Sequence, residues 1–221
     1  MELLHKINIF IHVASGSICL ILGLIALVSV KGSKRHNWAG RFFLCLISFV
    51  ILTGLLGVFV FGRNTFLLVI TVLSGYVSIS GYRVLKSKSN AINAWDVVLA
   101  VISLLVLAYF LYYFQSIGMI WSPIVIYSTV GALLFVLLYD FLRYLIPQKS
   151  YKKHRIWLYE HIYKMVSAFS ALLSAFAGTV LEAYQPHSQY LPSALGMLII
   201  IGFMIYVYRY GLKKMPNMRK A

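Results

Sequence analysis

The side chains that could do chemistry in this sequence are a few histidines and carboxylates near the ends of long apolar runs. His36, His154 and His161 stand in or beside basic segments, and the carboxylates Asp140 and Glu160 fall near the same boundaries. Imidazole nitrogens and carboxylate oxygens are ligands that zinc, manganese and iron accept. We therefore take these five residues as candidate ligands of a divalent metal ion. His36 and His161 are also candidate catalytic bases, because imidazole titrates near physiological pH.

The same parts of the sequence contain a further candidate, an arginine, and two potential ion pairs. Arg41 is a candidate catalytic or anion-binding residue, because its planar fork of donors suits a carboxylate or a phosphate. Asp140 with Arg143, and Glu160 with Lys164, have the spacings of ion pairs within one helix. A structural explanation of the carboxylates therefore stands beside the metal site, and histidines at a membrane interface also meet water and lipid phosphates.

Another histidine raises the question of haem. His12 is expected about five residues into the first apolar run, which makes it a candidate cofactor ligand. A haem held by two histidines needs them at matching depth on different helices. His12 and His161 are expected near opposite ends of their runs, roughly 15 Å apart in height at 1.5 Å per residue. Haem is therefore ranked below a divalent metal.

The composition decides which elements must position these residues. The chain has 221 residues, of which 61% are hydrophobic and 11% charged, and its mean hydropathy is +0.85. A soluble domain carries about 25% charged residues to wet its surface. Lipid must therefore cover most of this protein. The formal net charge of +15 would suggest nucleic acid in a soluble protein, but here the basic residues cluster between apolar runs, so no nucleic-acid partner is expected.

The apolar runs predict an all-α integral membrane protein, a bundle of seven transmembrane helices in a single domain over residues 1–221. A bilayer core about 30 Å thick needs roughly 20 apolar residues in a helix. Runs of about that length lie at residues 7–30, 42–62, 65–84, 96–115, 119–142, 157–181 and 193–211.

The distribution of charge predicts the orientation of the bundle. With seven helices, 17 Lys and Arg residues fall on one side of the membrane, and only Lys6 and Arg63 fall on the other. Basic residues concentrate in cytoplasmic connections, which places the N-terminus outside and the C-terminus inside. We expect location in a bacterial cytoplasmic (inner) membrane, with anionic lipid headgroups as partners at the cytoplasmic face.

Small residues recur at helical spacing on several of the expected helices. The first carries Gly16, Cys19 and Gly23 on one face, and the third carries Gly75 and Gly81 on another. Small residues let membrane helices approach closely, so these faces are expected to be packing seams. The same faces could border a polar cavity, and the two interpretations are compatible.

Two blocks of the sequence carry distinctive motifs. The first is His12 in the first helix followed by Lys31-Gly32-Ser33-Lys34-Arg35-His36-Asn37-Trp38-Ala39-Gly40-Arg41-Phe42, of the form K-G-x-x-x-H-x-x-x-G-R-aromatic. The second is His161-Ile162-Tyr163-Lys164-Met165, of the form H-x-x-x-M. Together they resemble a bacterial family of small polytopic predicted membrane proteins of unknown function. The resemblance implies functional weight for the residues that match the family motifs, namely His12, His36, Gly40, Arg41, His161 and Met165. It implies no reaction.

Two classes of function follow from these observations. The favoured hypothesis is a metal- or cofactor-binding membrane enzyme with a histidine and carboxylate site at the cytoplasmic interface, in which His36 and His161 meet. The alternative is a small transporter, channel or sensory membrane subunit without catalysis. The sequence leaves open whether the protein is an enzyme, what its substrate is, and whether it forms an oligomer or serves as a partner subunit.

Overall fold

The structure, a computed structural model, describes all residues except 63–64, 118–121 and 211–221. All regular elements in this part of the chain are helical. The long helices are α1 (Glu2–Val28), α2 (Lys34–Phe59), α3 (Thr65–Ser87), α4 (Ala94–Ile117), α5 (Pro123–Leu142), α7 (Ile156–Val180) and α8 (His187–Tyr210). The short ones are η1 (Arg143–Leu145), α6 (Gln148–Lys153) and η2 (Glu182–Tyr184).

The expected seven membrane helices are confirmed, because seven described helices are long and apolar enough to cross a membrane. Several begin earlier than hydropathy indicates. α2 starts at Lys34 rather than at residue 42, because Ser33 caps it and its side chain accepts a hydrogen bond from the His36 amide. The first turn of α2 is therefore helical, although its polar residues give no hydropathy signal. The described residues do not include residues 119–121 and 211 of the expected runs, Arg63, or the basic residues that follow Tyr210.

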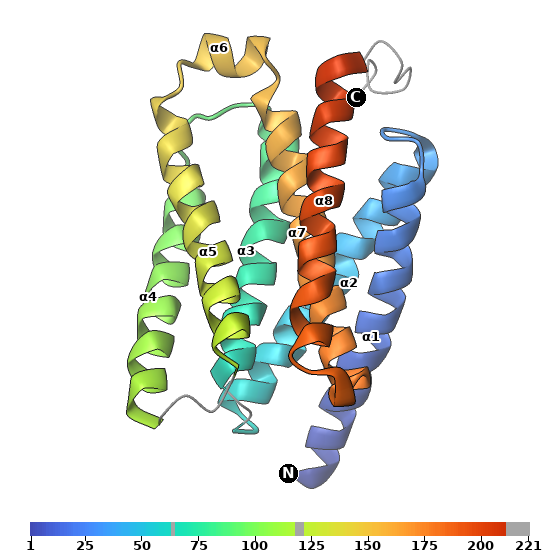
Figure 1. Cartoon of the computed structure of the whole chain (residues 1–221), viewed down its shortest axis with the longest axis vertical. Coiled ribbons are helices and arrows are strands. Elements are labelled where there is room, and N and C mark those ends of the chain that lie inside the picture. The colour runs from blue at the N-terminus through green and yellow to red at the C-terminus, as the bar shows by residue number, and fades with distance from the viewer. Residues whose placement is uncertain (63–64, 118–121, 211–221) are drawn as a thin grey trace.

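The seven helices run side by side, and their connections alternate between the two ends of the bundle (Figure 1). One end, which we call the basic end, holds the connections at residues 29–33 and 88–93 and helix α6. The N-terminus lies at the opposite end. This alternation is what seven membrane crossings require, and the side on which the basic end lies stays a prediction.

Helix α7 is the centre of the packing. It packs against α3 and α8 and also contacts α1, while α1 packs against α2. At Gly81 in α3 a Cβ atom would lie 2.9 Å from the Cβ of Lys164 in α7, so only glycine permits this close approach. The expected packing seam on the third helix is therefore present.

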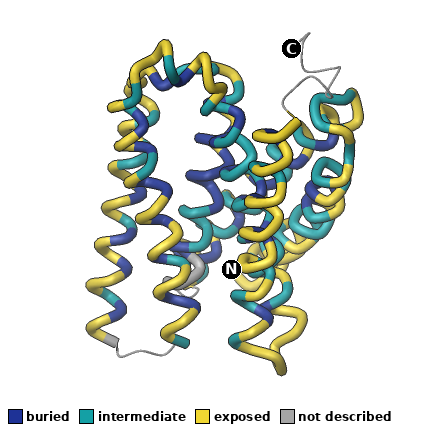
Figure 2. The backbone as a smooth tube through the Cα atoms, turned by 45° about the horizontal axis from the view of Figure 1, so that its top comes forward, coloured by how far each residue is buried: buried dark blue, intermediate teal, exposed yellow. Residues whose placement is uncertain are grey.

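The outward faces of the helices are apolar and exposed. Phe10, Leu105 and Tyr208 are 73%, 65% and 83% exposed. Figure 2 shows exposed positions following the outer sides of the helices along their length. Lipid is the environment that such faces require, since a water-soluble monomer rarely exposes large apolar patches. The chain is therefore a polytopic membrane protein.

Candidate functional site

A cavity of about 450 Å³ opens between α1 and α2 on one side and α3, α7 and α8 on the other. We call it the histidine cavity, because both His36 of α2 and His161 of α7 line it. Most of its wall is apolar or aromatic, with Phe43, Phe169 and Phe203 among the lining side chains. Both histidines therefore line one space, and that they share a ligand stays a prediction.

The local sequence explains how His36 reaches this cavity. Gly32 takes a positive φ of 76°, which lets the chain turn sharply after α1. Ser33 then starts α2, so that His36 lies in the first turn of this helix. Its Nδ1 lies 2.9 Å from the carbonyl oxygen of Ala26, in the last turns of α1. The turn therefore folds the imidazole back against the helix that precedes it.

His161 is held in the same manner by another helix. Its Nδ1 lies 3.0 Å from the carbonyl oxygen of Gly81 in α3. The absence of a side chain at Gly81 is what brings α3 this close to α7. Both candidate histidines are therefore anchored through the same ring nitrogen, each by a main-chain carbonyl of a neighbouring helix.

This anchoring fixes the tautomer of each ring. A carbonyl oxygen only accepts hydrogen bonds, so Nδ1 must carry the hydrogen and donate it. In the neutral imidazole the other nitrogen, Nε2, then has a free lone pair. Histidines that bind metals or act as bases are commonly oriented by such a hydrogen bond on the remote nitrogen. The histidine cavity thus contains two oriented nitrogen donors.

The charged residues that line the histidine cavity are all cations. Lys31, Arg41 and Lys88 belong to the lining, and no Asp or Glu does so among the described residues. Lys31 donates to the carbonyl oxygens of Ala26 and Leu27 and lies over the ring of Phe203. Burial lowers the pKa of Lys31 to about 8. A half-buried cation with no carboxylate among the described lining residues favours a negatively charged group of a ligand.

The carboxylates lie elsewhere, in a buried ion network between α3, α5 and α7. Lys164 Nζ lies 2.6 and 2.8 Å from the two carboxylate oxygens of Asp140, and Tyr76 donates to the same carboxylate at 2.7 Å. Arg143 donates to Glu160 at 2.8 Å, and so does Tyr139 at 2.9 Å. Lys164 is 0% and Glu160 2% exposed. The network therefore satisfies its charges inside the protein.

The intrahelical pairs expected from spacing are present but are the longer contacts. Arg143 Nε lies 3.7 Å from Asp140, and Lys164 lies 3.9 Å from Glu160. Each cation makes its short contact with the carboxylate of the other helix instead. Sequence spacing alone did not reveal this exchange, because it depends on which faces of α5 and α7 are adjacent.

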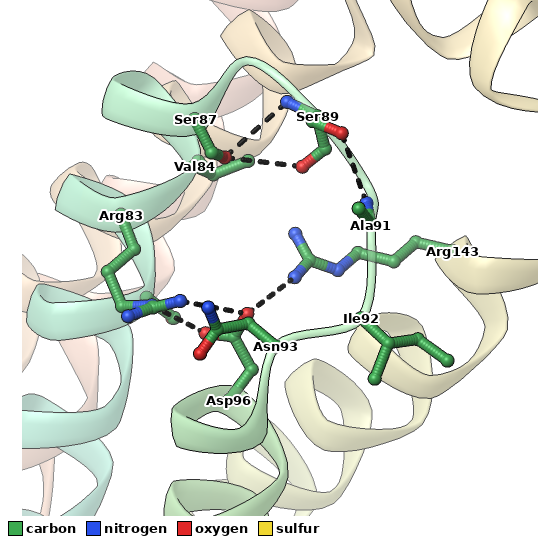
Figure 3. Close-up of a pocket in the computed structure, with 10 residues that line it drawn as sticks. Arg83, Val84, Ser87, Ser89, Ala91, Ile92, Asn93, Asp96 and Arg143 are labelled. Carbon is green, nitrogen blue, oxygen red and sulfur yellow. Dashed lines mark hydrogen bonds and ion pairs between the residues drawn. The ribbon is translucent and has the colours of Figure 1, made fainter.

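The ion network extends to a smaller cavity of about 150 Å³ at the basic end. Asp96 accepts hydrogen bonds from Arg83 at 2.7 and 3.3 Å and lies 3.7 Å from Arg143. Figure 3 shows Arg83, Asp96 and Arg143 converging beneath the connection between α3 and α4. The network therefore joins three carboxylates to three cations, and their formal charges sum to zero.

The remaining predicted residues are dispersed. His154 is exposed in the connection before α7. His12 lies within α1, and its Nδ1 is 2.9 Å from Thr53 Oγ1 of α2. In the described part of the chain no group of three or more His, Cys, Asp or Glu side chains could hold a metal ion. The expected ligand set of three histidines and two carboxylates is thus not brought together.

Several residues of these two regions were missed by sequence reasoning. The charge pattern gives Lys31 and Lys88 only a role in topology, and Tyr76 of the ion network stands in no sequence motif. A signal for Lys31 was present, since it begins the same K-G-x-x-x-H block as His36. Nothing comparable marked Tyr76, because its partner Asp140 lies 64 positions away.

Comparisons with known proteins give no further guide, as no family model, curated protein or solved structure matches this chain. The resemblance to the bacterial family of predicted membrane proteins stays a prediction.

Proposed function

We propose that this membrane protein binds a largely apolar, anionic cofactor or substrate in the histidine cavity. The observation that carries the proposal is the convergence of two distant sequence blocks on one space. Lys31, His36 and Arg41 of the first block and His161 and Met165 of the second all line this cavity. Residues that served only to pack helices would have no reason to surround a volume that no side chain fills.

The size and lining of the histidine cavity support a small organic ligand. Ligand pockets usually have volumes of about 300–1,000 Å³ and mostly apolar walls with a few oriented polar groups. This cavity has about 450 Å³, aromatic walls, two oriented imidazoles and a cationic part. A free divalent cation would find cations there instead of carboxylates. The ligand should therefore bring its own negative charge.

The orientation of the bundle belongs to the same proposal. The concentration of Lys and Arg at the basic end supports a cytoplasmic position for this end. The ligand would then enter from the cytoplasmic leaflet or the cytoplasm. The basic connections would also attract anionic lipid headgroups, at about 1 kcal/mol for each charge near the surface.

Gly40 offers a direct test of the proposal. It lines the histidine cavity, and a Cβ added to it would meet no atom within 4 Å. Gly40→Leu should therefore fill the space without forcing the helices apart. Gly131 of α5 is exposed and equally free of neighbours, so Gly131→Leu is a matched control.

Native mass spectrometry of the proteins released from their own membranes gives the readout. We expect a bound molecule in the wild type and in Gly131→Leu, with occupancy at least tenfold lower in Gly40→Leu. Equal occupancy in Gly40→Leu, or no bound molecule in any of the three proteins, would contradict the proposal.

A further inference from the structure

We infer that the ligand of the histidine cavity is an iron porphyrin, with His36 and His161 as its two axial ligands; this inference rests on the proposed function. Two nitrogen donors are held in one cavity, and each has its Nε2 lone pair available because Nδ1 donates to a main-chain carbonyl.

A bare metal ion does not suit this donor set. Structural and catalytic zinc sites use at least three protein ligands, and the described residues offer no group of three His, Cys, Asp or Glu side chains. A porphyrin supplies four equatorial nitrogens of its own, so that the protein needs to provide only the two axial positions. Two imidazoles complete such a coordination sphere.

The rest of the cavity matches the other parts of a porphyrin. The macrocycle is flat and apolar, and Phe43 and Phe169 line the cavity with aromatic rings. Gly40 leaves open space where any other residue would project a side chain. The two propionate groups are anionic, and Lys31 and Arg41 provide cations without competing carboxylates.

The depths of the two histidines also agree. His36 lies in the first turn of α2 and His161 in the second turn of α7, and both helices start at the basic end. The depth mismatch that disfavours haem concerns the pair His12 and His161. His12 is instead engaged with Thr53, away from the histidine cavity. Pairing His36 with His161 removes the mismatch.

Hemin titration of the purified protein in detergent tests the inference. We expect saturable binding of one hemin per chain, with the absorption and electron paramagnetic resonance spectra of a six-coordinate low-spin iron. His36→Gly and His161→Gly should each abolish the low-spin spectrum, and added imidazole should restore it. The restoration shows that each variant is folded. His154→Gly, which changes an exposed histidine, should leave the spectrum unchanged.

Two results would overturn the axial assignment. One is a low-spin spectrum that persists in His36→Gly or His161→Gly without imidazole. The other is a spectrum that changes in Met165→Leu but not in His36→Gly, because methionine is also an axial ligand in some haem proteins. If hemin does not bind, while Gly40→Leu still loses the native ligand, the porphyrin inference fails and the proposed function stands. If Gly40→Leu changes nothing either, both fail.

Discussion

The ion network and the histidine cavity lie at the same end of the bundle, but their polar groups are used in opposite ways. In the ion network the carboxylates of Asp140 and Glu160 each meet a cation and a tyrosine hydroxyl at hydrogen-bond distance. In the histidine cavity each of the two imidazoles is fixed through Nδ1, and Nε2 of neither ring has a hydrogen-bond partner among the described residues. Polar residues in a membrane are costly and usually functional. The difference suggests that the first set holds helices together and the second set binds.

The largest effect is expected where the ion network is most deeply buried. Lys164→Met removes the cation that faces Asp140 and leaves a carboxylate uncompensated in the interior. Removing one partner of a buried ion pair typically costs about 3–5 kcal/mol. The unfolding free energy in a reversible detergent assay should decrease by about this amount.

A double variant separates charge balance from packing. Lys164→Met combined with Asp140→Asn removes both charges and should recover much of the loss, because neither charge is then left alone. If Lys164→Met alone lowers the unfolding free energy by less than about 1 kcal/mol, the pair does not hold the helices together. The ion network would then not differ from the histidine cavity in its structural role.

A pH dependence should distinguish the histidine cavity from the ion network. Burial lowers the pKa of Lys31 from 10.5 to about 8. A bound anion favours the charged lysine and raises this pKa again, so that binding takes up a proton above about pH 8. Ligand affinity should decrease by up to about tenfold per pH unit above about pH 8. The measurement is ligand occupancy after equilibration at each pH.

The unliganded protein should respond with the opposite sign. The unfolded chain keeps a lysine pKa near 10.5 and so binds more protons than the folded chain between about pH 8 and 10.5. Stability should therefore increase with pH in this window, while affinity decreases. Lys31→Met should remove both dependences. An affinity that stays constant up to pH 10 in the wild type would show that Lys31 does not meet the anion.

A smaller effect is expected for the hydrogen bond between His12 and Thr53. This contact joins α1 to α2 outside both regions. Hydrogen bonds between membrane helices contribute about 0.6 kcal/mol on average and about 1.7 kcal/mol at most. Thr53→Val should lower the stability by this amount and leave ligand occupancy unchanged. Loss of the ligand would place His12 in the binding site and contradict our division of the histidines.

The smallest effect is expected at the outer edge of the ion network. The side chains of Arg83 and Asp96 are 30% and 15% exposed, unlike the fully buried Lys164. Ion pairs accessible to water contribute only about 0.2–1 kcal/mol. Arg83→Gln should therefore cost no more than this in the same unfolding assay. If Arg83→Gln lowers the unfolding free energy as much as Lys164→Met does, the contribution of an ion pair in this network does not depend on its burial.

The fold was largely predictable from sequence because its signal is local. Seven apolar runs and the alternation of basic connections indicate seven helices without any knowledge of their packing. Helix starts were less accurate, since the hydropathy signal is lost over the polar first turn of α2, where Ser33 and His36 are already part of the capped helix.

The candidate site was predictable only in part, because it depends on neighbours across the bundle. The sequence predicts that His36 and His161 lie close together, and both line the cavity. It also predicts that Asp140 and Glu160 join them. The structure assigns these carboxylates to Lys164 and Arg143, since the faces of α5 and α7 meet around these cations. Which cation each carboxylate contacts cannot be deduced from positions along the chain.

A crystal structure of the protein purified from its own membranes and grown from a lipidic mesophase would test the central claim most directly. We expect electron density for a bound molecule in the histidine cavity that contacts Nε2 of both His36 and His161 and places its anionic part beside Lys31. The account would be contradicted by a cavity closed by protein side chains, with both Nε2 atoms hydrogen-bonded to the protein, or by a ligand that touches neither imidazole.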